Sequence, residues 1–561
     1  MVFLIFAAIG IFFAVPFETF GDGTEFAISS AVLGISHPPS YPLFIIISKF
    51  FYCLPFGNVA FRVNLFSALT AATTAFLVYK LYKGNSLDKL FLAIITFFSR
   101  TFFENAVTGE VYALNLLFFV AVIFLLEEQD DKRRFYFASF LVGLGAGNHH
   151  TILFLTFYLL YNFLRNRKTL LLSDAAISVT LFLLGFSCYI YLPFRAINKP
   201  VWNWGNPANF ELFINSFFRH DFQSDGLVRD VTTFLSQLIT FNPINEFGLL
   251  GAVIAISSLI LIFFSNKREF LRLITLIFLY SIFIIILLGN DKLTPEERKD
   301  TYAVFFIPAY FLLCYAVVIA TKSVKKNIKF ACYFLFLVSV LINQSGVLSD
   351  FMSFSSLAFP HDYAKAQLSI MPKNSVLIVT GGEKDFPVIY QQKIGNFRQD
   401  VKLINLAMLG RRWNFKDSLE AGATYTKGYE GETENKKQIL KAIILFQKEF
   451  RNNRVLLNVF DEKELPDTLK YYVNGLFYET DDRHDLSLGY VRGRSLEDAP
   501  PAFKELLLSA KDSYDKSGNQ QESQKAASLL SRIKKRYPPP ERGQVNYPFL
   551  PFFPPPLEKG D

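Results

Sequence analysis

Long apolar runs separated by short polar connections fill the first 348 residues of this 561-residue chain. An α-helix needs roughly 20 apolar residues to cross a hydrocarbon core of about 30 Å. The chain is therefore predicted to be a polytopic α-helical membrane protein with about eleven transmembrane helices. The runs cover 2–17, 59–79, 88–103, 111–127, 135–148, 151–164, 170–194, 246–265, 271–289, 302–321 and 329–348.

The composition excludes several classes of protein. Apolar residue types make up 51% of the chain and charged types 19%, which excludes a disordered chain and argues against an ordinary soluble enzyme. The net charge of +8 is spread over short clusters between the apolar runs, so it does not form the basic face that nucleic-acid binding requires. The four cysteines show no CxxC or metal-ligand spacing, so neither a disulfide framework nor a zinc site is indicated.

Basic residues mark every second connection between the runs, and the positive-inside rule makes these connections cytoplasmic. The basic clusters are Lys80/Lys83/Lys89, Lys132/Arg133/Arg134, Arg165/Arg167/Lys168, Lys267/Arg268/Arg272 and Lys322/Lys325/Lys326/Lys329. The connections expected on the other face are 18–58, 104–110, 149–150, 195–245 and 290–301, together with everything after residue 348. We therefore expect a protein of a bacterial inner membrane, with its site and its C-terminal half in the periplasm.

Two short apolar segments need separate interpretation. Residues 2–17 follow no basic segment and precede no small-residue cleavage site, which favours a retained first span over a signal peptide. Residues 41–55 must not cross the bilayer if the charge pattern is to hold. This segment is short and carries Lys49 in its middle. Pro38 and Pro39 precede it and Pro42 lies at its start, so we expect a helix lying along the outer membrane surface.

The expected spans have no Asp, Glu, Lys or Arg near their middle. Pumps and ion-coupled transporters usually need such ionisable groups within the membrane. The chemistry is therefore expected in the outer loops, at the membrane interface.

The first outer loop carries three carboxylates, Glu18, Asp22 and Glu25, and no Lys or Arg before Lys49. A carboxylate at the edge of a bilayer is partly desolvated, which raises its pKa and makes it a better proton acceptor for a hydroxyl substrate. Asp22 and Glu25 are therefore candidate catalytic bases. In the alternative interpretation they only cap a surface helix that begins near Thr24.

The second outer loop ends at Glu110, which is followed by Tyr112 and Asn115. Glu110 would stand at the N-terminus of the helix expected over 111–127, where the helix dipole favours an anion. That position gives Glu110 a structural explanation beside a functional one.

Later outer loops offer histidines and arginines. The pair His149 and His150 could bind a metal, but with no third ligand nearby in sequence a hydrogen-bonding or phosphate-contacting role is favoured, and no metal is predicted. Arg195 and Arg219, with Trp204 between them, suit a phosphate head group emerging from lipid, because guanidinium binds phosphate in a bidentate fork. In the alternative interpretation the arginines are interfacial anchors.

Ordered motifs run through most of residues 16–207. They are Asp22-Gly-Thr-Glu25-Phe, His37-Pro-Pro-Ser-Tyr41-Pro42-Leu, Phe56-Gly-Asn-Val-Ala-Phe-Arg62-Val-Asn64, Glu110-Val-Tyr-Ala-Leu-Asn115, Gly147-Asn-His149-His150-Thr and Tyr191-Leu-Pro-Phe-Arg195 with Asn203-Trp-Gly. This series resembles the DUF2723 family, which includes an animal transmembrane protein O-mannosyltransferase and has a fold of the GT-C class. The chain departs from the family pattern at Ser40, where glycine usually follows the prolines, and at Gly382-Glu383-Lys384, where the family usually has Gly-Asp-Asn.

The resemblance implies an inverting glycosyltransferase that moves a sugar such as mannose from a polyprenyl-phosphate carrier to a hydroxyl acceptor, with protein Ser/Thr favoured. It implies Asp22 as the leading base and Glu25 as the second candidate. Glu110 would orient sugar or acceptor, and the donor phosphate would be held by Arg195, Arg219 or His149. Further substrate-binding residues are expected at His37, Tyr41, Tyr112, Asn115, His150 and Trp204. No cofactor or divalent metal is indicated, and the expected partners are membrane lipid, the polyprenyl-phosphate sugar and a protein or glycan acceptor.

Two functions from other classes compete with this one. A transporter or flippase of a lipid-linked glycan could use the same cations to hold a phosphate without breaking its bond to the sugar. Charged groups along a path through the membrane would favour transport, and the expected spans have none near their middle. A membrane-anchored scaffold would leave the acidic first loop without a purpose.

The C-terminal half reads as a soluble α/β domain with a helical tail over 349–536, after a transmembrane catalytic domain over 1–348. Short β-rich runs at 376–380, 401–406, 454–459 and 486–491 alternate with helical stretches at 387–394, 437–450, 500–512 and 519–536. Residues 537–561 form a proline-rich tail. We expect the α/β domain to recognise the acceptor or a partner and not to perform chemistry.

Overall fold

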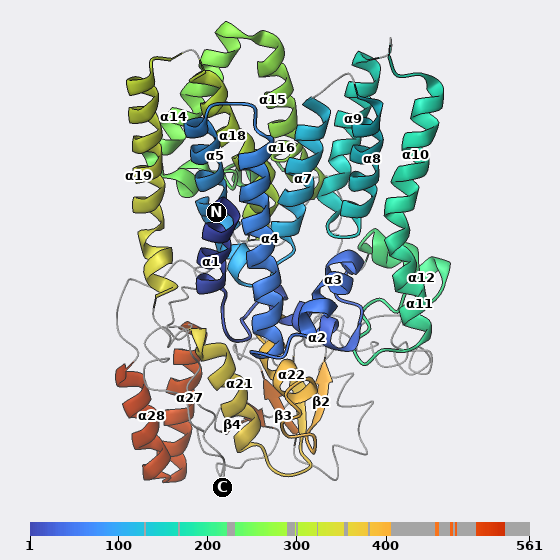
Figure 1. Ribbon diagram of the computed structural model, residues 1–561. Helices are drawn as coiled ribbons and strands as arrows, with labels where there is room; N and C mark the ends of the chain where they lie inside the picture. Colours follow the sequence, from blue (N-terminus) through green and yellow to red (C-terminus); the bar gives the residue numbers. More distant parts are fainter. Residues whose placement is uncertain are drawn as a thin grey trace.

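Figure 1 shows a bundle of long helices with a smaller α/β part at one end of it. The computed structural model describes residues 1–127, 131–166, 169–220, 230–288, 298, 301–322, 324–352, 357–379, 382–405, 455–458, 472–474, 477–479 and 501–532. The predicted helix over 437–450, the predicted strand over 486–491 and the predicted tail over 537–561 lie outside the described residues.

Helices occupy every range in which a membrane span was expected. They are α1 (Val2–Phe13), α4 (Val59–Leu81), α5 (Ser86–Phe98), α6 (Arg100–Val107), α7 (Tyr112–Glu127), α8 (Lys132–Ala146), η1 (His150–Phe154), α9 (Leu155–Arg165), α10 (Leu172–Phe186), α14 (Pro243–Ser265), α15 (Lys267–Leu279), α16 (Ile282–Leu288), η4 (Val304–Phe306), α18 (Ile307–Ala320) and α19 (Lys326–Asp350). Helix α10 continues into η2 (Ser187–Ile190) and α11 (Tyr191–Ile197). Shorter helices lie in the connections: α2 (Asp22–Val32), α3 (Pro42–Tyr52), α12 (Phe210–Phe217) and α13 (Val231–Leu238).

Among the described residues, six helical segments are long and apolar enough to cross a membrane, or seven if the bent pair α5 and α6 is one span. The six are Val59–Leu81, Leu172–Ile197, Pro243–Ser265, Lys267–Leu287, Thr301–Ala320 and Lys326–Leu348. The chain is therefore a polytopic helical membrane protein, but the expected count of eleven spans is not reached. Helices α1, α7, α8 and α9 have 12, 16, 15 and 11 residues. At about 1.5 Å per residue they are shorter than a hydrocarbon core of about 30 Å.

The expected span over 88–103 is interrupted by a bend of 61° between α5 and α6. At the break, the buried carboxylate of Glu246 accepts hydrogen bonds from the Ser99 hydroxyl at 2.7 Å and from the backbone N–H of Thr101 at 3.1 Å. Glu246 thereby satisfies an N–H group at the start of α6 that has no partner within its own helix. The apolar run gave no sign of this break, because its cause lies in a distant helix.

The apolar segment at 41–55 folds as α3, which has 11 residues and is too short to cross the bilayer. The Lys49 ammonium donates a hydrogen bond to the backbone carbonyl of Ala31 at 2.6 Å and so ties α3 to the end of α2. Both helices lie at the end of the bundle that faces the α/β part (Figure 1). The expected helix is confirmed, and its position along the membrane surface stays a prediction.

The connections fall at two ends of the bundle, as the alternating charges predicted. At one end, three contacts join the connections 18–58, 104–110, 149–150 and 195–245. They are those of Glu110 with Gly23, Tyr41 with His149, and Glu25 with Trp202. Basic residues from the alternate connections form ion pairs elsewhere, namely Lys132 with Asp174, Arg272 with Glu127, and Lys329 with Asp88.

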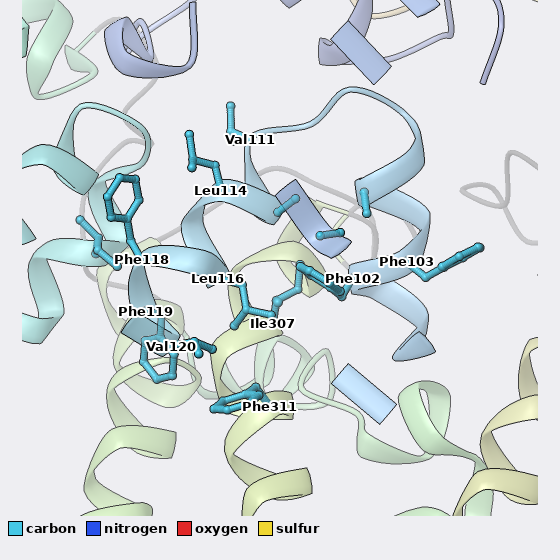
Figure 2. Packing of buried hydrophobic residues seen from close by; sticks show 14 of the residues in the cluster. Phe102, Phe103, Val111, Leu114, Leu116, Phe118, Phe119, Val120, Ile307 and Phe311 are labelled. Carbon is cyan, nitrogen blue, oxygen red and sulfur yellow. The ribbon is translucent and has the colours of Figure 1, made fainter. Parts of the chain in front are cut away.

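Aromatic and branched side chains form the core of the bundle. Figure 2 shows those of α6, α7 and α18 packed together, including Phe102, Phe119 and Phe311. The rings of Phe119 and Phe311 meet edge to face with a centroid distance of 6.2 Å. Such close packing is the main source of helix association inside a bilayer. It fixes α7, whose first turns carry the candidate site residues Tyr112 and Asn115.

The α/β part contains a five-stranded sheet with the order β2-β1-β3-β5-β4. The strands are β1 (Val376–Val379), β2 (Lys402–Asn405), β3 (Val455–Asn458), β4 (Tyr472–Asn474) and β5 (Phe477–Glu479). Strand β1 runs parallel to β2 and β3, whereas β5 is antiparallel to β3 and β4. The helices are α21 (Phe359–Ile370), α22 (Phe386–Lys393), α27 (Pro501–Ser517) and α28 (Gln520–Arg532). The strands predicted at 376–380, 401–406 and 454–459 and the helices predicted at 387–394, 500–512 and 519–536 are confirmed. Helix α21 and strands β4 and β5 were not expected, and the domain boundaries stay a prediction.

Candidate functional site

The candidate site begins where α2 starts, at Asp22. The N-cap residue of α2 is Gly21, which has no side chain to bind the free N–H groups. Glu110 supplies the missing acceptor, because its Oε1 accepts a hydrogen bond from the backbone N–H of Gly23 at 3.0 Å. A Cβ on Gly23 would lie 2.0 Å from the backbone carbonyl oxygen of Thr108, so only glycine permits this approach. Glu110 thus precedes α7 as expected, and its side chain also binds the N-terminus of α2.

Glu25 is fully buried in α2 and holds His37 in place. Its carboxylate accepts hydrogen bonds from the His37 backbone N–H at 2.9 Å, from His37 Nδ1 at 2.5 Å and from the Trp202 indole N–H at 3.0 Å. On the other side of the imidazole, Nε2 lies 3.0 Å from the Tyr41 hydroxyl and 3.6 Å from Asp22 Oδ2. Glu25 is thus a positioning carboxylate, and His37 connects it to Asp22.

Asp22 is the accessible carboxylate of this group. Its side chain is 30% exposed, whereas that of Glu25 is 0% exposed. Partial burial raises the pKa of Asp22, and the charge of Glu25 adds to this rise, while His37 and Arg219 oppose it. For His37, burial lowers the pKa, but the two carboxylates outweigh burial and the pKa is raised. A reachable carboxylate with a raised pKa is what proton abstraction from a hydroxyl requires, which favours Asp22 over Glu25.

The α/β part reaches the rim of the site through Glu383, in the turn before α22. Burial raises the pKa of Glu110 well above its usual range, and the charges of Asp22 and Glu383 raise it further, although the Gly23 N–H opposes them. The electrostatic effect of Glu383 on Glu110 places an acidic residue of the α/β part near the first loop. The sequence singled out Glu383 only as a departure from the family pattern.

Glu18 fastens the first loop to the α/β part. Its buried carboxylate accepts a hydrogen bond from the side-chain amide of Gln391 on α22, and it pairs with His361 Nδ1 on α21 at 2.9 Å. The Tyr390 hydroxyl accepts a further hydrogen bond from the backbone N–H of Ala60 at 3.2 Å. No local sequence pattern indicates these partners, because 343 residues separate Glu18 from His361.

Tyr112 and His149 line the site beside Tyr41. The His149 ring stacks on Tyr41 with a centroid distance of 6.1 Å and lies 5.4 Å from the Tyr112 ring. Its Nδ1 accepts a hydrogen bond from the Thr151 backbone N–H at 3.3 Å, and Asn115 donates to the Thr151 hydroxyl at 3.0 Å. Burial lowers the pKa of His149 well below its usual value. The ring is therefore neutral and carries its proton on Nε2, where it is a hydrogen-bond donor.

His150 has different partners from its neighbour His149. Its Nε2 lies 2.9 Å from the Tyr189 hydroxyl, and its ring packs against Phe217 at 4.4 Å. Burial lowers the pKa of His150 to about 3. The two histidines thus belong to separate contacts and do not form a metal site together.

The two candidate arginines have different surroundings. The charge of Arg219 affects the pKa of Asp22, of Tyr41 and of both histidines, so Arg219 lies beside the site. Arg195 instead donates hydrogen bonds from Nε to the Leu33 carbonyl at 2.7 Å and from Nη2 to the Val32 carbonyl at 3.2 Å. These carbonyls end α2, where a cation is favoured. The structure gives Arg195 a helix-capping contact, whereas Arg219 lies close enough to Asp22 to affect its pKa.

Trp202, which the sequence analysis did not single out, donates its indole N–H to Glu25, and the ring of the expected residue Trp204 packs edge to face against that of Trp202 at 6.3 Å. Trp204 is buried, and its backbone N–H donates to the Ile35 carbonyl at 3.0 Å. The Ile35 N–H donates in turn to the Trp202 carbonyl at 2.8 Å. A Cβ on Gly34 would lie 2.6 Å from that carbonyl oxygen, so Gly34 allows this close pairing and with it the Trp202 contact to Glu25.

Asp22, Glu25 and His37 also lie close enough together to be considered as metal ligands. One ligand atom of each lies within 4.8 Å of the other two, and carboxylate oxygens and imidazole nitrogens both bind divalent metals. Glu25 and His37 already hydrogen-bond to each other, and a metal would have to displace their contacts with Trp202 and Tyr41 as well. The donor set is therefore better explained as a hydrogen-bonded group.

Two family models match parts of this chain. Residues 22–171 match the family described as "Protein O-mannosyl-transferase TMEM260 N-terminal domain", and residues 360–437 match "TMEM260-associated domain 2". The first match includes every candidate residue from Asp22 to His150. It excludes Arg195, Trp204 and Arg219.

Curated proteins similar to this chain include one from mouse and one from Dictyostelium discoideum. The mouse protein named "Protein O-mannosyl-transferase TMEM260" is 28% identical over 253 residues, which are 41% of this chain and 36% of the mouse protein. The Dictyostelium discoideum protein of the same name is 23% identical over 461 residues, which are 71% of this chain and 56% of that protein. No solved structure matches the chain. The chain therefore resembles TMEM260 proteins over part of their length.

Proposed function

We propose that this protein is an inverting glycosyltransferase of the GT-C type, which moves mannose from a polyprenyl-phosphate carrier to a Ser or Thr hydroxyl of a protein. The observation that carries the proposal is the position of Asp22, an accessible carboxylate held beside His37 and within the electrostatic reach of Arg219. The names of the two relatives support mannose and a protein acceptor.

In the proposed reaction, Asp22 takes the proton of the acceptor hydroxyl. The acceptor oxygen forms a bond to the anomeric carbon while the bond between that carbon and the carrier phosphate oxygen breaks, and attack from the opposite face inverts the configuration. The electron pair leaves with the phosphate, whose charge Arg219 stabilises. His37, aligned by Glu25, holds Asp22 in position.

The α/β part would recognise the acceptor. Glu383 contributes negative charge at the rim, close enough to act on Glu110, and the Glu18 contact with His361 keeps this part next to the first loop. Hydroxyl-bearing segments with basic neighbours are the acceptors that such an acidic rim would favour.

Transfer should be measured with purified full-length protein, polyprenyl phosphate that carries a labelled mannose, and a peptide rich in Ser and Thr. The buffer should contain EDTA. Labelled peptide with inverted anomeric configuration is the expected product, because no metal takes part in the proposed step. Activity that appears only when Mn²⁺ or Mg²⁺ is added would assign a metal to Asp22, Glu25 and His37. Movement of intact lipid-linked sugar across vesicles without transfer would replace the proposal by a flippase.

We also propose that the site and the α/β part face the periplasm. Support comes from the basic connections, whose residues Lys132, Arg272 and Lys329 lie at the other end of the bundle, where the positive-inside rule puts the cytoplasm. An alkaline phosphatase fusion at residue 360 should be active. A fusion there that is active only with a cytoplasmic reporter would invert the orientation.

The arginines give a matched pair of variants. Arg219→Ala should raise the KM for the donor about tenfold or more, because a lost hydrogen bond to a charged group costs about 1.5 to 3 kcal/mol. Arg195→Ala should lower thermal stability and leave the donor KM close to that of the parent, because its contacts are to the carbonyls of Leu33 and Val32. Initial rates at varied donor concentration, together with melting curves, test both. The reverse result would make Arg195 the phosphate ligand.

A further inference from the structure

A polar cavity lies between the end of α9 and the start of α15. Figure 1 shows these two helix ends at the end of the bundle opposite α2. The cavity has a volume of about 450 Å³. Its lining consists of Tyr161, Arg165, Asn266, Arg268, Glu269 and Arg272. Three arginines against one glutamate make the cavity cationic, and nothing in the proposed transfer reaction uses it.

Arg272 is the buried arginine of the cavity, with a side chain only 9% exposed. Its Nη atoms donate to Glu127 at 3.4 Å, to Glu269 at 2.5 Å and to the Tyr158 hydroxyl at 3.2 Å. Within the described part of the chain, its buried Nε has no hydrogen-bond partner. An unsatisfied buried guanidinium N–H is costly, so an acceptor at this position would remove a penalty that the protein alone leaves in place.

Arg268 adds an exposed cation at the same cavity and forms no ion pair with any other described residue. The positive-inside rule explains why basic residues gather at this end of the bundle. It does not explain why the end of α9 and the start of α15, which are far apart in the chain, bring their arginines to one cavity. Converging guanidinium groups are typical of a site for phosphate, which they bind in a bidentate fork.

The helices beside the cavity present apolar side chains to their surroundings. Leu160 and Leu164 on α9 are 54% and 58% exposed, and Leu271 on α15 is 61% exposed. In a membrane protein such surfaces face acyl chains. A ligand with a phosphate at one end and apolar chains at the other would match both the cavity and these flanks.

We propose that this cavity binds the phosphate head group of an anionic membrane lipid, with the acyl chains lying along α9 and α15. Arg165, Arg268 and the Nε of Arg272 would be its ligands. Inorganic phosphate offers the same head-group chemistry without the chains, so the apolar flanks are the reason to favour lipid.

Binding to the full-length protein in detergent should be followed by native mass spectrometry and by the shift in Tm on adding phosphatidylglycerol, phosphatidylcholine or inorganic phosphate. Phosphatidylglycerol should bind most tightly and raise the Tm most. The Arg165→Gln/Arg268→Gln double variant should weaken its binding about tenfold or more, because it loses charge-assisted hydrogen bonds. Both residues lie outside the candidate site, so sugar transfer measured in detergent without added lipid should be unchanged.

Arg133→Gln is the matched control, because it removes one exposed positive charge from a different basic cluster on α8. It should leave phosphatidylglycerol binding as it is in the parent protein. Equal loss in this control and in the double variant would reduce the effect to general surface charge and overturn the site. Equal stabilisation by inorganic phosphate, or equal binding of the two phospholipids, would overturn the assignment to an anionic lipid.

Discussion

Replacing Asp22 with asparagine is expected to reduce turnover by roughly 10² to 10⁴-fold, the usual contribution of general-base catalysis. Asparagine preserves the size and much of the hydrogen-bonding shape of aspartate, but it cannot accept the acceptor's proton. Donor binding should stay close to that of the parent, because the phosphate is assigned to Arg219. Single-turnover transfer and donor affinity, measured on the same preparation, separate these two effects.

Variants of two further carboxylates help to interpret this result, one as a control and one as the competing candidate base. Glu104→Gln removes a carboxylate that pairs with Arg100 at 3.2 Å outside the site, and it should leave turnover unchanged. Glu25→Gln should lower both stability and turnover, because its amide cannot accept all three hydrogen bonds from His37 and Trp202. If Asp22→Asn transfers sugar at the parent rate while a folded Glu25→Gln is inactive, the base is Glu25. If both variants remain fully active, the first loop does not catalyse the reaction.

The pH dependence of Asp22 catalysis follows from the direction of its pKa shift. A base works when deprotonated, so kcat/KM should fall as the pH is lowered through the pKa of Asp22, which lies above that of an ordinary aspartate. The charge of Glu25 also raises the pKa of Asp22. Glu25→Gln should therefore move this acidic limb to lower pH, whereas Glu104→Gln should not. A limb that stays in place in Glu25→Gln would show that another group controls it.

The sequence predicted those features of the fold that depend on local patterns. Apolar runs placed the helices, and alternating basic clusters placed the loops at two ends, because both signals lie within a few residues of what they describe. Helix length was less predictable. The run over 88–103 looked continuous, yet it bends where Glu246 binds the start of α6, and Glu246 lies 147 residues away from Ser99.

The candidate site shows the same division between local and distant effects. Asp22, Glu25 and His37 were recognised as motif residues. Their proposed roles as base and positioning residues depend on contacts that no local pattern describes. Glu25 became a positioning residue because Trp202, 177 residues away, donates to it. The motifs therefore named the side chains of the proposed site, while the proposed division into base and positioning residue rests on burial and hydrogen bonding.

Lys329→Met is expected to lower the free energy of unfolding by about 3 to 5 kcal/mol, the usual cost of leaving one charge of a buried pair without its partner. The Lys329 ammonium lies 3.0 Å from Asp88 Oδ1, and the two side chains are only 5% and 3% exposed. The Tyr333 hydroxyl also donates to Asp88 at 3.1 Å, but a neutral hydrogen bond does not replace a cation beside a buried carboxylate. Equilibrium unfolding in mixed detergent micelles measures the loss.

Neutralising both partners distinguishes this explanation from a general packing defect. In Asp88→Asn/Lys329→Met no buried charge remains, and Tyr333 can still hydrogen-bond to the asparagine, so most of the lost stability should return. Lys516→Met, in the exposed pair with Asp512, should change stability by no more than about 0.5 kcal/mol. A double variant as unstable as Lys329→Met would mean that the lysine side chain stabilises α19 by its packing and not by its charge. Recovery would mean that the ion pair between Asp88 and Lys329 stabilises the contact of α5 with α19 through its charges.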